Sequence, residues 1–372
     1  MPAEPGAMDG IPVYDHLLEV RSLRTFFFEP DGVRKAVNDV SFNLDEGSIL
    51  GLVGESGCGK TMTGMSLLRL VPPPGRLVGG SVLLEGRDIM GLPEKQFRKI
   101  RGGTISLIFQ EPGAALNPVL TVGSQIAETA RVHRGLSRRD SMDEAVRMLQ
   151  EVRIPDPARR AREYPHQLSG GMKQRAMIAM ALVCHPSILI ADEPTTALDV
   201  TIQAQILDLL ASLRDRFGLS ILLITHDLGV VAEIADRVAV MYAGRIVEEA
   251  GVLDLFRDPR HPYTRGLLAS MPGVAAPVGG RLAAIEGAVP DLLSMPDGCV
   301  FLPRCPDRFE ACDGWHPPLQ PTIGPATRGP AGSRPSVPSD TSFRKVACFQ
   351  HEPPAGAPLA VDGAGWDPER GR

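Results

Sequence analysis

The chain has 372 residues, 43% hydrophobic and 22% charged, which suffices for one large or two medium domains with a buried core. Its formal net charge of -5 gives no general electrostatic attraction to nucleic acid or anionic lipid. No run of roughly 18 apolar residues indicates a membrane span, and residues 1–10 lack a signal-peptide pattern. We therefore expect the chain to stay in the cytosol, with no nucleic acid as partner.

The chain begins with two expected β-strands. Residues 17–28 and 36–44 are rich in strand-favouring residues, and a Pro-Asp-Gly turn signal at 30–32 separates them. This pattern predicts an antiparallel start to the fold. The three phenylalanines at 26–28 are more typical of a hydrophobic core than of a cofactor contact.

A glycine-rich loop comes next. Residues 54–61 match G-x-x-x-x-G-K-[ST] and lie between an apolar run at 49–53 and a helical pattern at 62–70. Glycines let successive backbone N–H groups turn toward an anion, and the start of the helix adds further unsatisfied N–H groups. Lys60 would supply charge to the β- and γ-phosphates, and Thr61 a hydroxyl to Mg²⁺. A chance glycine-rich turn is the alternative, which the strand-loop-helix context disfavours. The predicted nucleotide-contacting residues are Gly54, Ser56, Gly57, Gly59, Lys60, Thr61 and Met62.

The middle of the chain predicts an α/β core with a helical insertion. Residues 81–84 and 105–109 favour strands, and residues 111–119 have loop composition. From 122 to about 164 the pattern is helical and strongly charged. Ser169, Gly170 and Gly171 then open another helix that extends to about residue 184, with Ser169 as its N-cap.

Two further strands end in candidate catalytic side chains. The apolar run 187–191 is typical of a strand buried on both faces, and it leads to Asp192 and Glu193. Carboxylates there are costly unless they have a function, so we expect Asp192 to serve Mg²⁺ and Glu193 to orient or deprotonate water. A structural role in capping the next turn is the alternative. After a helix at 200–217, a strand at 220–224 leads to His226, a candidate γ-phosphate sensor.

Together these motifs resemble the nucleotide-binding subunits of ABC transporters over about residues 15–255. The resemblance identifies 54–61 as the Walker A loop, Gln110 as the Q-loop glutamine, and 188–192 as Walker B. Residues 168–172 (Leu-Ser-Gly-Gly-Met) resemble the signature, 197–199 the D-loop, and His226 the switch histidine. The signature ends in Met172, where most members carry Gln; this resembles the branch that imports oligopeptides, dipeptides and nickel.

The resemblance implies a P-loop NTPase fold: a RecA-like core with an antiparallel β subdomain and a helical subdomain at about 115–185. It implies that Thr61, Gln110 and Asp192 serve Mg²⁺, while Lys60, Glu193 and His226 act in ATP hydrolysis. Phe27 would stack on adenine, with Phe26 and Phe28 as alternatives because strand register is open.

The resemblance also implies partners. Ser169, Gly170 and Gly171 would contact ATP held by a second ATPase, which is either a paralogous subunit or a second copy of this chain. Two membrane permease subunits would complete the transporter on the cytoplasmic side of the membrane, and an extracytoplasmic binding protein would act indirectly. A nickel or other small-solute importer ATPase is the alternative function, and a soluble ABC ATPase without a transport role is another.

The remaining sequence resembles the C-terminal extension of peptide-importer ATPases, at 256–352, with residues 353–372 expected to form a disordered tail. Residues 261–268 predict a helix, and 320–342 have the composition of a mobile loop. Four cysteines fall here: Cys299, Cys305, Cys312 and Cys348. The spacing alone is weak evidence and leaves buried thiols or zinc open. Some members of the resembling branch hold a [4Fe–4S] cluster, which is therefore our expectation for these cysteines, with zinc as the alternative.

Overall fold

The computed structural model describes residues 14–271, 284–321 and 344–350, except Ala197, Trp315 and Phe349. Internal contacts divide the chain into a first unit, Met1–Arg245, and a second unit, Ile246–Arg372. The sequence predicts a flexible N-terminus at residues 1–14 and a disordered tail at 353–372. Residues 1–13 and the whole of that tail lie outside the described residues.

The first unit opens with an antiparallel sheet, in the order β2-β1-β4-β5. Its strands are β1 (Leu18–Glu29), β2 (Gly32–Leu44), β4 (Gly75–Leu84) and β5 (Arg87–Asp88). The prediction that the three phenylalanines lie in the core is wrong: Phe26 and Phe27 are half-buried, and the Phe28 side chain is 43% exposed. The register of β1 against β2 shifts between Thr25 and Phe27, and such a bulge redirects the side chains that follow it.

The core of the first unit is a parallel sheet, in the order β9-β3-β8-β7-β6. Its strands are β3 (Ile49–Val53), β6 (Ile105–Ile108), β7 (Ile188–Asp192), β8 (Ser220–Thr225) and β9 (Arg237–Tyr242). Every residue of β3, β7 and β8 is buried, as expected for strands covered on both faces. All pairings are parallel, so the loops that follow β3, β6, β7 and β8 leave from the same edge.

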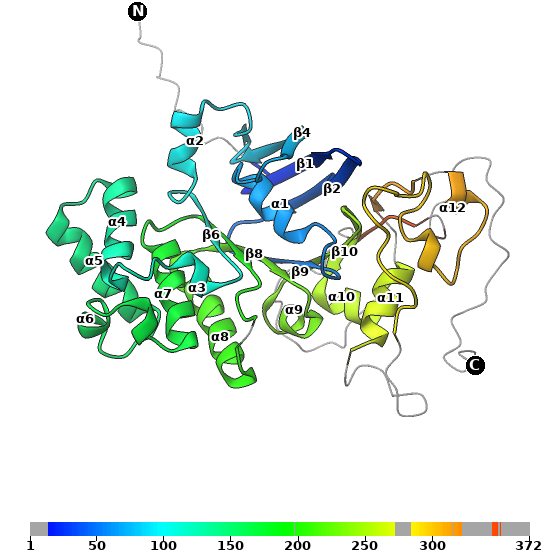
Figure 1. Ribbon diagram of the computed structural model, residues 1–372. Coiled ribbons are helices and arrows are strands. Elements are labelled where there is room, and N and C mark those ends of the chain that lie inside the picture. Colours follow the sequence, from blue (N-terminus) through cyan, green and yellow to red (C-terminus); the bar gives the residue numbers. More distant parts are fainter. Residues whose placement is uncertain are drawn as a thin grey trace, which may run out of the picture. The chain divides into compact units, whose positions relative to one another are not determined.

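Helices flank these sheets, and α4 to α7 gather into one group in Figure 1. The helices of the first unit are α1 (Lys60–Leu67), α2 (Glu94–Ile100), α3 (Pro112–Ala115), α4 (Val122–Arg134), α5 (Arg138–Glu151), α6 (Pro157–Arg160), η1 (Pro165–Gln167), α7 (Gly170–Leu182), α8 (Val200–Phe217) and α9 (Leu228–Ile234). The expected loop at 111–119 contains the short helix α3. N-caps fix several starts: the side chains of Thr121, Ser137 and Ser169 each accept a backbone N–H of the first turn.

The second unit is smaller and loop-rich. Its elements are β10 (Arg245–Gly251, which begins at the last residue of the first unit), α10 (Val252–Arg257), α11 (Pro262–Ala269), η2 (Leu302–Arg304), α12 (Ala311–Gly314), β11 (Gln320–Pro321) and β12 (Lys345–Val346). The predicted mobile loop at 320–342 therefore begins with a short strand, because Gln320 pairs with Val346 of β12. The rest of that prediction, 322–342, lies outside the described residues.

A buried carboxylate fixes the start of α11. Glu248 on β10 has no exposed surface and accepts the backbone N–H groups of Arg260 and His261, both at 2.9 Å. Burial raises the pKa of Glu248, while these two hydrogen bonds favour its charged form. This interaction ties the chain before α11 to β10.

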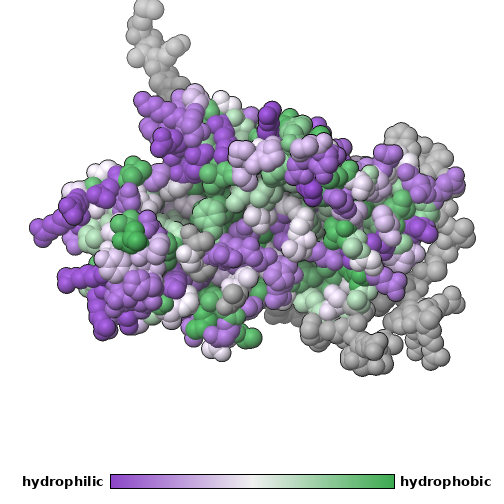
Figure 2. Space-filling model, viewed as in Figure 1, coloured by the Kyte–Doolittle hydropathy of each residue, from purple (hydrophilic) through white to green (hydrophobic). Residues whose placement is uncertain are grey.

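The visible surface is mostly hydrophilic over the group formed by α4 to α6 (Figure 2). Among the residues that the structure describes, no helix combines the length and hydrophobicity needed to cross a bilayer.

Two glycines of the loop between β3 and α1 differ in how much space surrounds them, and substitution of each tests the effect of this difference on stability. Gly57 and Gly59 have φ angles of 80° and 105°, but a Cβ added at Gly59 would lie 2.1 Å from the carbonyl oxygen of Ala36, whereas nothing lies within 4 Å at Gly57. Both Gly→Ala variants should lose about 1–2 kcal/mol from the left-handed backbone. Gly59→Ala should lose clearly more because of the clash, measured by urea unfolding of the full chain; equal losses would contradict this reading.

Candidate nucleotide site

The loop between β3 and α1 surrounds the Lys60 ammonium with backbone oxygens. Lys60 begins α1 and is 5% exposed. Its Nζ donates to the carbonyl oxygens of Gly54, at 2.8 Å, and Glu55, at 2.9 Å. A buried cation is thus held at a helix N-terminus and next to a glycine loop, which together favour anion binding.

Thr61 and Asp192 bring two oxygen ligands together from α1 and β7. The Thr61 hydroxyl donates to Asp192 Oδ1 at 3.2 Å, and Asp192 is 5% exposed. Burial raises the pKa of Asp192 to about 6, and the neighbouring Glu193 adds to the rise. Carboxylate and hydroxyl oxygens suit Mg²⁺, and a bound cation would favour the charged form, so this pair fits a magnesium site.

Three donors from three segments meet on the carboxylate of Glu193. Gln110 Nε2 donates to Glu193 Oε2 at 2.8 Å, and the Thr196 hydroxyl donates to the same oxygen at 2.7 Å. His226 Nδ1 lies 2.9 Å from Oε1. Glu193 follows the last residue of β7, with a φ of 45°, a left-handed conformation uncommon for glutamate. The structure therefore brings Gln110, Glu193 and His226, three of the predicted residues, into direct contact.

Hydrogen bonds outweigh burial in setting the pKa of Glu193. Burial alone would raise its pKa, but hydrogen bonds from His226 and then Thr196, together with the charge of Lys60, hold the pKa below its usual range. The carboxylate is therefore charged at neutral pH. In that state it can accept a hydrogen bond or a proton from a water molecule.

Thr196 is a contact that the sequence analysis missed. The signal that points to it is local: Glu193 is followed by Pro194, a residue that favours the second position of a turn. The backbone N–H of Thr196 returns to the carbonyl of Glu193 at 3.2 Å. A hydroxyl three residues beyond a carboxylate, across such a turn, is placed to reach it.

The residues predicted to recognise adenine lie along β1 and have different surroundings. A Cβ added at Gly75 would lie 2.8 Å from the Phe27 ring. The Lys35 ammonium lies 6.0 Å from the centre of the Phe26 ring, and the Arg76 guanidinium lies 5.7 Å from that of Phe28. Stacking of Phe27 on adenine stays a prediction.

The start of α7 presents Ser169 and Gly170 to solvent. The Ser169 hydroxyl caps α7 by accepting the N–H of Met172 at 3.4 Å. A Cβ added at Gly171 would lie 2.9 Å from the Ile202 side chain, so Gly171 lets α7 approach α8 closely. These contacts of Ser169 and Gly171 lie within α7 and toward α8. The site on the loop and the start of α7 are therefore separate features of one chain.

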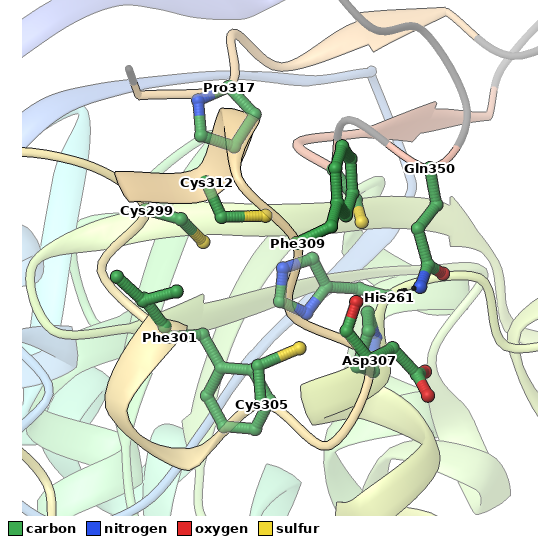
Figure 3. Close-up of a pocket in the computed structure, with 12 residues that line it drawn as sticks. His261, Cys299, Phe301, Cys305, Asp307, Phe309, Cys312, Pro317 and Gln350 are labelled. Atoms are coloured by element: carbon green, nitrogen blue, oxygen red, sulfur yellow. Dashed lines mark hydrogen bonds between the residues drawn. The ribbon is translucent and has the colours of Figure 1, made fainter. Parts of the chain in front are cut away.

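The second unit contains a pocket lined by four thiols. Figure 3 shows the labelled side chains of Cys299, Cys305 and Cys312 around this pocket, and Cys348 lines it as well. Apolar side chains such as Phe301 contribute most of the remaining wall. All four cysteines are free thiols. The structure thus gathers the predicted set of cysteines from segments up to 49 residues apart, between Cys299 and Cys348.

The thiols affect one another within the pocket. Burial raises the pKa of Cys299, and it raises those of Cys305 and Cys348 to about 12, with smaller contributions from the neighbouring thiols. A soft metal would suit these sulfur donors and would displace their protons. Yet the described residues contain no group of three or more His, Cys, Asp or Glu side chains arranged to hold a metal ion. The donor chemistry fits a metal centre, but this conformation does not form one.

Two family descriptions match the chain. Residues 37–196 match "ABC transporter", and residues 247–312 match "Oligopeptide/dipeptide transporter, C-terminal region". The first match covers the glycine loop, Gln110, the start of α7 and Glu193. The second begins within β10 and ends at Cys312, so it covers three of the four pocket cysteines.

Curated relatives match most of the chain. It is 53% identical over 306 residues to the probable peptide ABC transporter ATP-binding protein y4tR of Sinorhizobium fredii, which covers 82% of this chain and 91% of the relative. It is 50% identical over 304 residues both to the dipeptide transport ATP-binding protein DppD of Bacillus subtilis and to the oligopeptide transport ATP-binding protein OppD of Salmonella typhimurium, with 82% of this chain and 90% of each relative covered.

Solved structures match the nucleotide-binding part. The dimeric post-hydrolysis structure of the ATP-binding cassette MJ0796, bound to ADP and Pi, has a TM-score of 0.57 at 27% identity, and the match covers 63% of this chain and 98% of that one. The cbiO1 protein from Clostridium perfringens, part of the transporter complex cbiONQ, has a TM-score of 0.57 at 26% identity, with 66% and 92% covered. With its P-loop fold and its transporter-specific C-terminal region, the chain belongs to the ABC transporter ATPases of the oligopeptide/dipeptide branch.

Proposed function

We propose that this protein is the ATP-hydrolysing motor subunit of an importer for dipeptides or oligopeptides. The observation that carries the proposal is the cluster of Lys60, the Thr61–Asp192 pair and Glu193 at one edge of a parallel sheet, in a chain with the peptide-transporter C-terminal region. Relatives named for peptide, dipeptide and oligopeptide transport support the substrate class.

In this proposal different residues of the first unit bind the phosphates, hold Mg²⁺ and activate water. Lys60 and the loop N–H groups bind the phosphates, while Thr61, Gln110 and Asp192 hold Mg²⁺ directly or through water. When bound, Mg²⁺ neutralises negative charge on the phosphates. Glu193 orients the attacking water and accepts its proton, and His226 keeps the Glu193 carboxylate charged and contacts the γ-phosphate.

The exposed start of α7 points to a second ATPase. Ser169, Gly170 and Gly171 form a capped helix N-terminus that is separate from the glycine loop of the same chain, and a helix N-terminus of this kind suits a phosphate. We therefore assign these residues to ATP bound by a partner, either a paralogous ATPase or a second copy. The motor would attach to two membrane permease subunits at the cytoplasmic face of the membrane, and a binding protein outside would supply the peptide.

Glu193→Gln should retain ATP binding while hydrolysis falls by orders of magnitude, because the amide cannot accept a proton from water. ATP binding and phosphate release by the full chain measure the two effects. Glu233→Gln, the same change at an exposed position of α9, is the matched control and should leave both unchanged. Normal turnover in Glu193→Gln would remove Glu193 from the mechanism.

We further propose that the four cysteines of the second unit hold a metal centre, a [4Fe–4S] cluster in preference to zinc. The support is the set of four thiols around one mostly apolar pocket. To bind one metal centre, the four sulfur atoms would have to lie closer together than they do in this conformation. Because the pocket contains no part of the nucleotide site, the centre would be structural or redox-sensing, as a staple for a loop-rich unit.

Anaerobically purified protein should contain about four irons and four sulfides per chain, with a broad visible absorbance. Cys305→Ser should lower the metal content sharply, because it removes one ligand. Cys184→Ser, in the first unit and not among the residues that line the pocket, is the control and should not lower it. Stoichiometric zinc in the purified protein would replace the cluster assignment, and metal-free protein would refute the metal centre.

A further inference from the structure

A short turn holds the Thr196 hydroxyl against the carboxylate of Glu193. Glu193 occupies the first position of the turn, Pro194 the second and Thr196 the fourth. The Thr196 backbone N–H donates to the Glu193 carbonyl at 3.2 Å, and its hydroxyl donates to Glu193 Oε2 at 2.7 Å. Two hydrogen bonds between the same pair of residues fix the direction in which the carboxylate points.

The other two donors on this carboxylate come from separate segments. Gln110 lies in the loop after β6 and is exposed, and His226 lies after β8. Both are connected to Glu193 only through space, so a shift of either loop breaks its contact. Thr196 travels with Glu193, because the turn joins them and the Glu193 backbone N–H is anchored to Ile224 of β8 at 2.8 Å.

We propose that Thr196 is a positioning residue for ATP hydrolysis, which holds Glu193 Oε2 so that Oε1, beside its contact with His226 Nδ1 at 2.9 Å, directs its second lone pair toward the attacking water. This inference rests on the proposed role of Glu193. A carboxylate oxygen has two lone pairs, and Oε2 uses both, for Gln110 and Thr196. If Gln110 served Mg²⁺ as proposed and left Oε2, the Thr196 hydroxyl would still hold that oxygen. Without the hydroxyl, the carboxylate could rotate about its terminal torsion, which is broad for glutamate.

The test compares Thr196→Val, which keeps the shape of the side chain, with Thr196→Ser, which keeps the hydroxyl. In the full chain assembled with its transporter subunits, Thr196→Val should lower kcat about tenfold to a hundredfold, with KM for ATP little changed. Thr196→Ser should restore the rate. Thr104→Val, at the opposite end of the sheet before β6, controls for the substitution itself.

The same substitution in a Glu193→Gln protein distinguishes failure of this inference from failure of the proposed function. In Glu193→Gln protein, Thr196→Val should cause no further loss of residual hydrolysis, because its effect passes through the carboxylate. Wild-type kcat in Thr196→Val, or an equal loss in both backgrounds, would overturn the inference while leaving Glu193 as the base. If Glu193→Gln itself turns over normally, the proposed function of Glu193 fails first. Thr196→Ala serves in the same comparisons if Thr196→Val does not fold.

Discussion

The site depends on one geometric constraint, the common direction of the strands in the parallel sheet. Since β3, β6, β7 and β8 all run the same way, the loops that carry Lys60, Gln110, Glu193 and His226 leave from one edge. Residues that are far apart in the chain, such as Gln110 and Glu193, therefore meet at 2.8 Å. The buried apolar strands stabilise the sheet, and the segments at their carboxyl ends carry the polar side chains of the site.

Two neighbouring carboxylates lie at this edge of the sheet and have different pKa values. Asp192 and Glu193 are adjacent carboxylates at the end of a buried strand, an arrangement that is unfavourable for both. The surroundings of the two carboxylates shift their pKa values in opposite directions. Burial leaves Asp192 with a pKa of about 6, whereas hydrogen bonds keep Glu193 charged despite its own burial. Such a split is typical of sites in which one carboxylate awaits a cation and the other acts as a base.

Much of the nucleotide site could be predicted from the sequence because its signals are local. The loop that ends in Lys60 and Thr61, and the apolar strand that ends in Asp192, each combine a short pattern with a short element. The phenylalanines could not be placed, because a bulge between Thr25 and Phe27 changes the register of β1 and has no sequence pattern of its own. Thr196 was missed because its contact depends on a turn and on a left-handed Glu193, which are properties of backbone conformation. The four cysteines could be grouped by resemblance, but spacing alone does not determine how closely their sulfur atoms approach.

The contact between Gly171 and Ile202 has a mechanical consequence. Ile202 lies in the first turn of α8, six residues after Thr196, and packs directly on the first turn of α7. Both residues are half-buried, and a larger side chain at position 171 would have to displace Ile202. The close approach of the two helix starts therefore depends on a glycine at this position, so Gly171 constrains where Ser169 lies relative to α8.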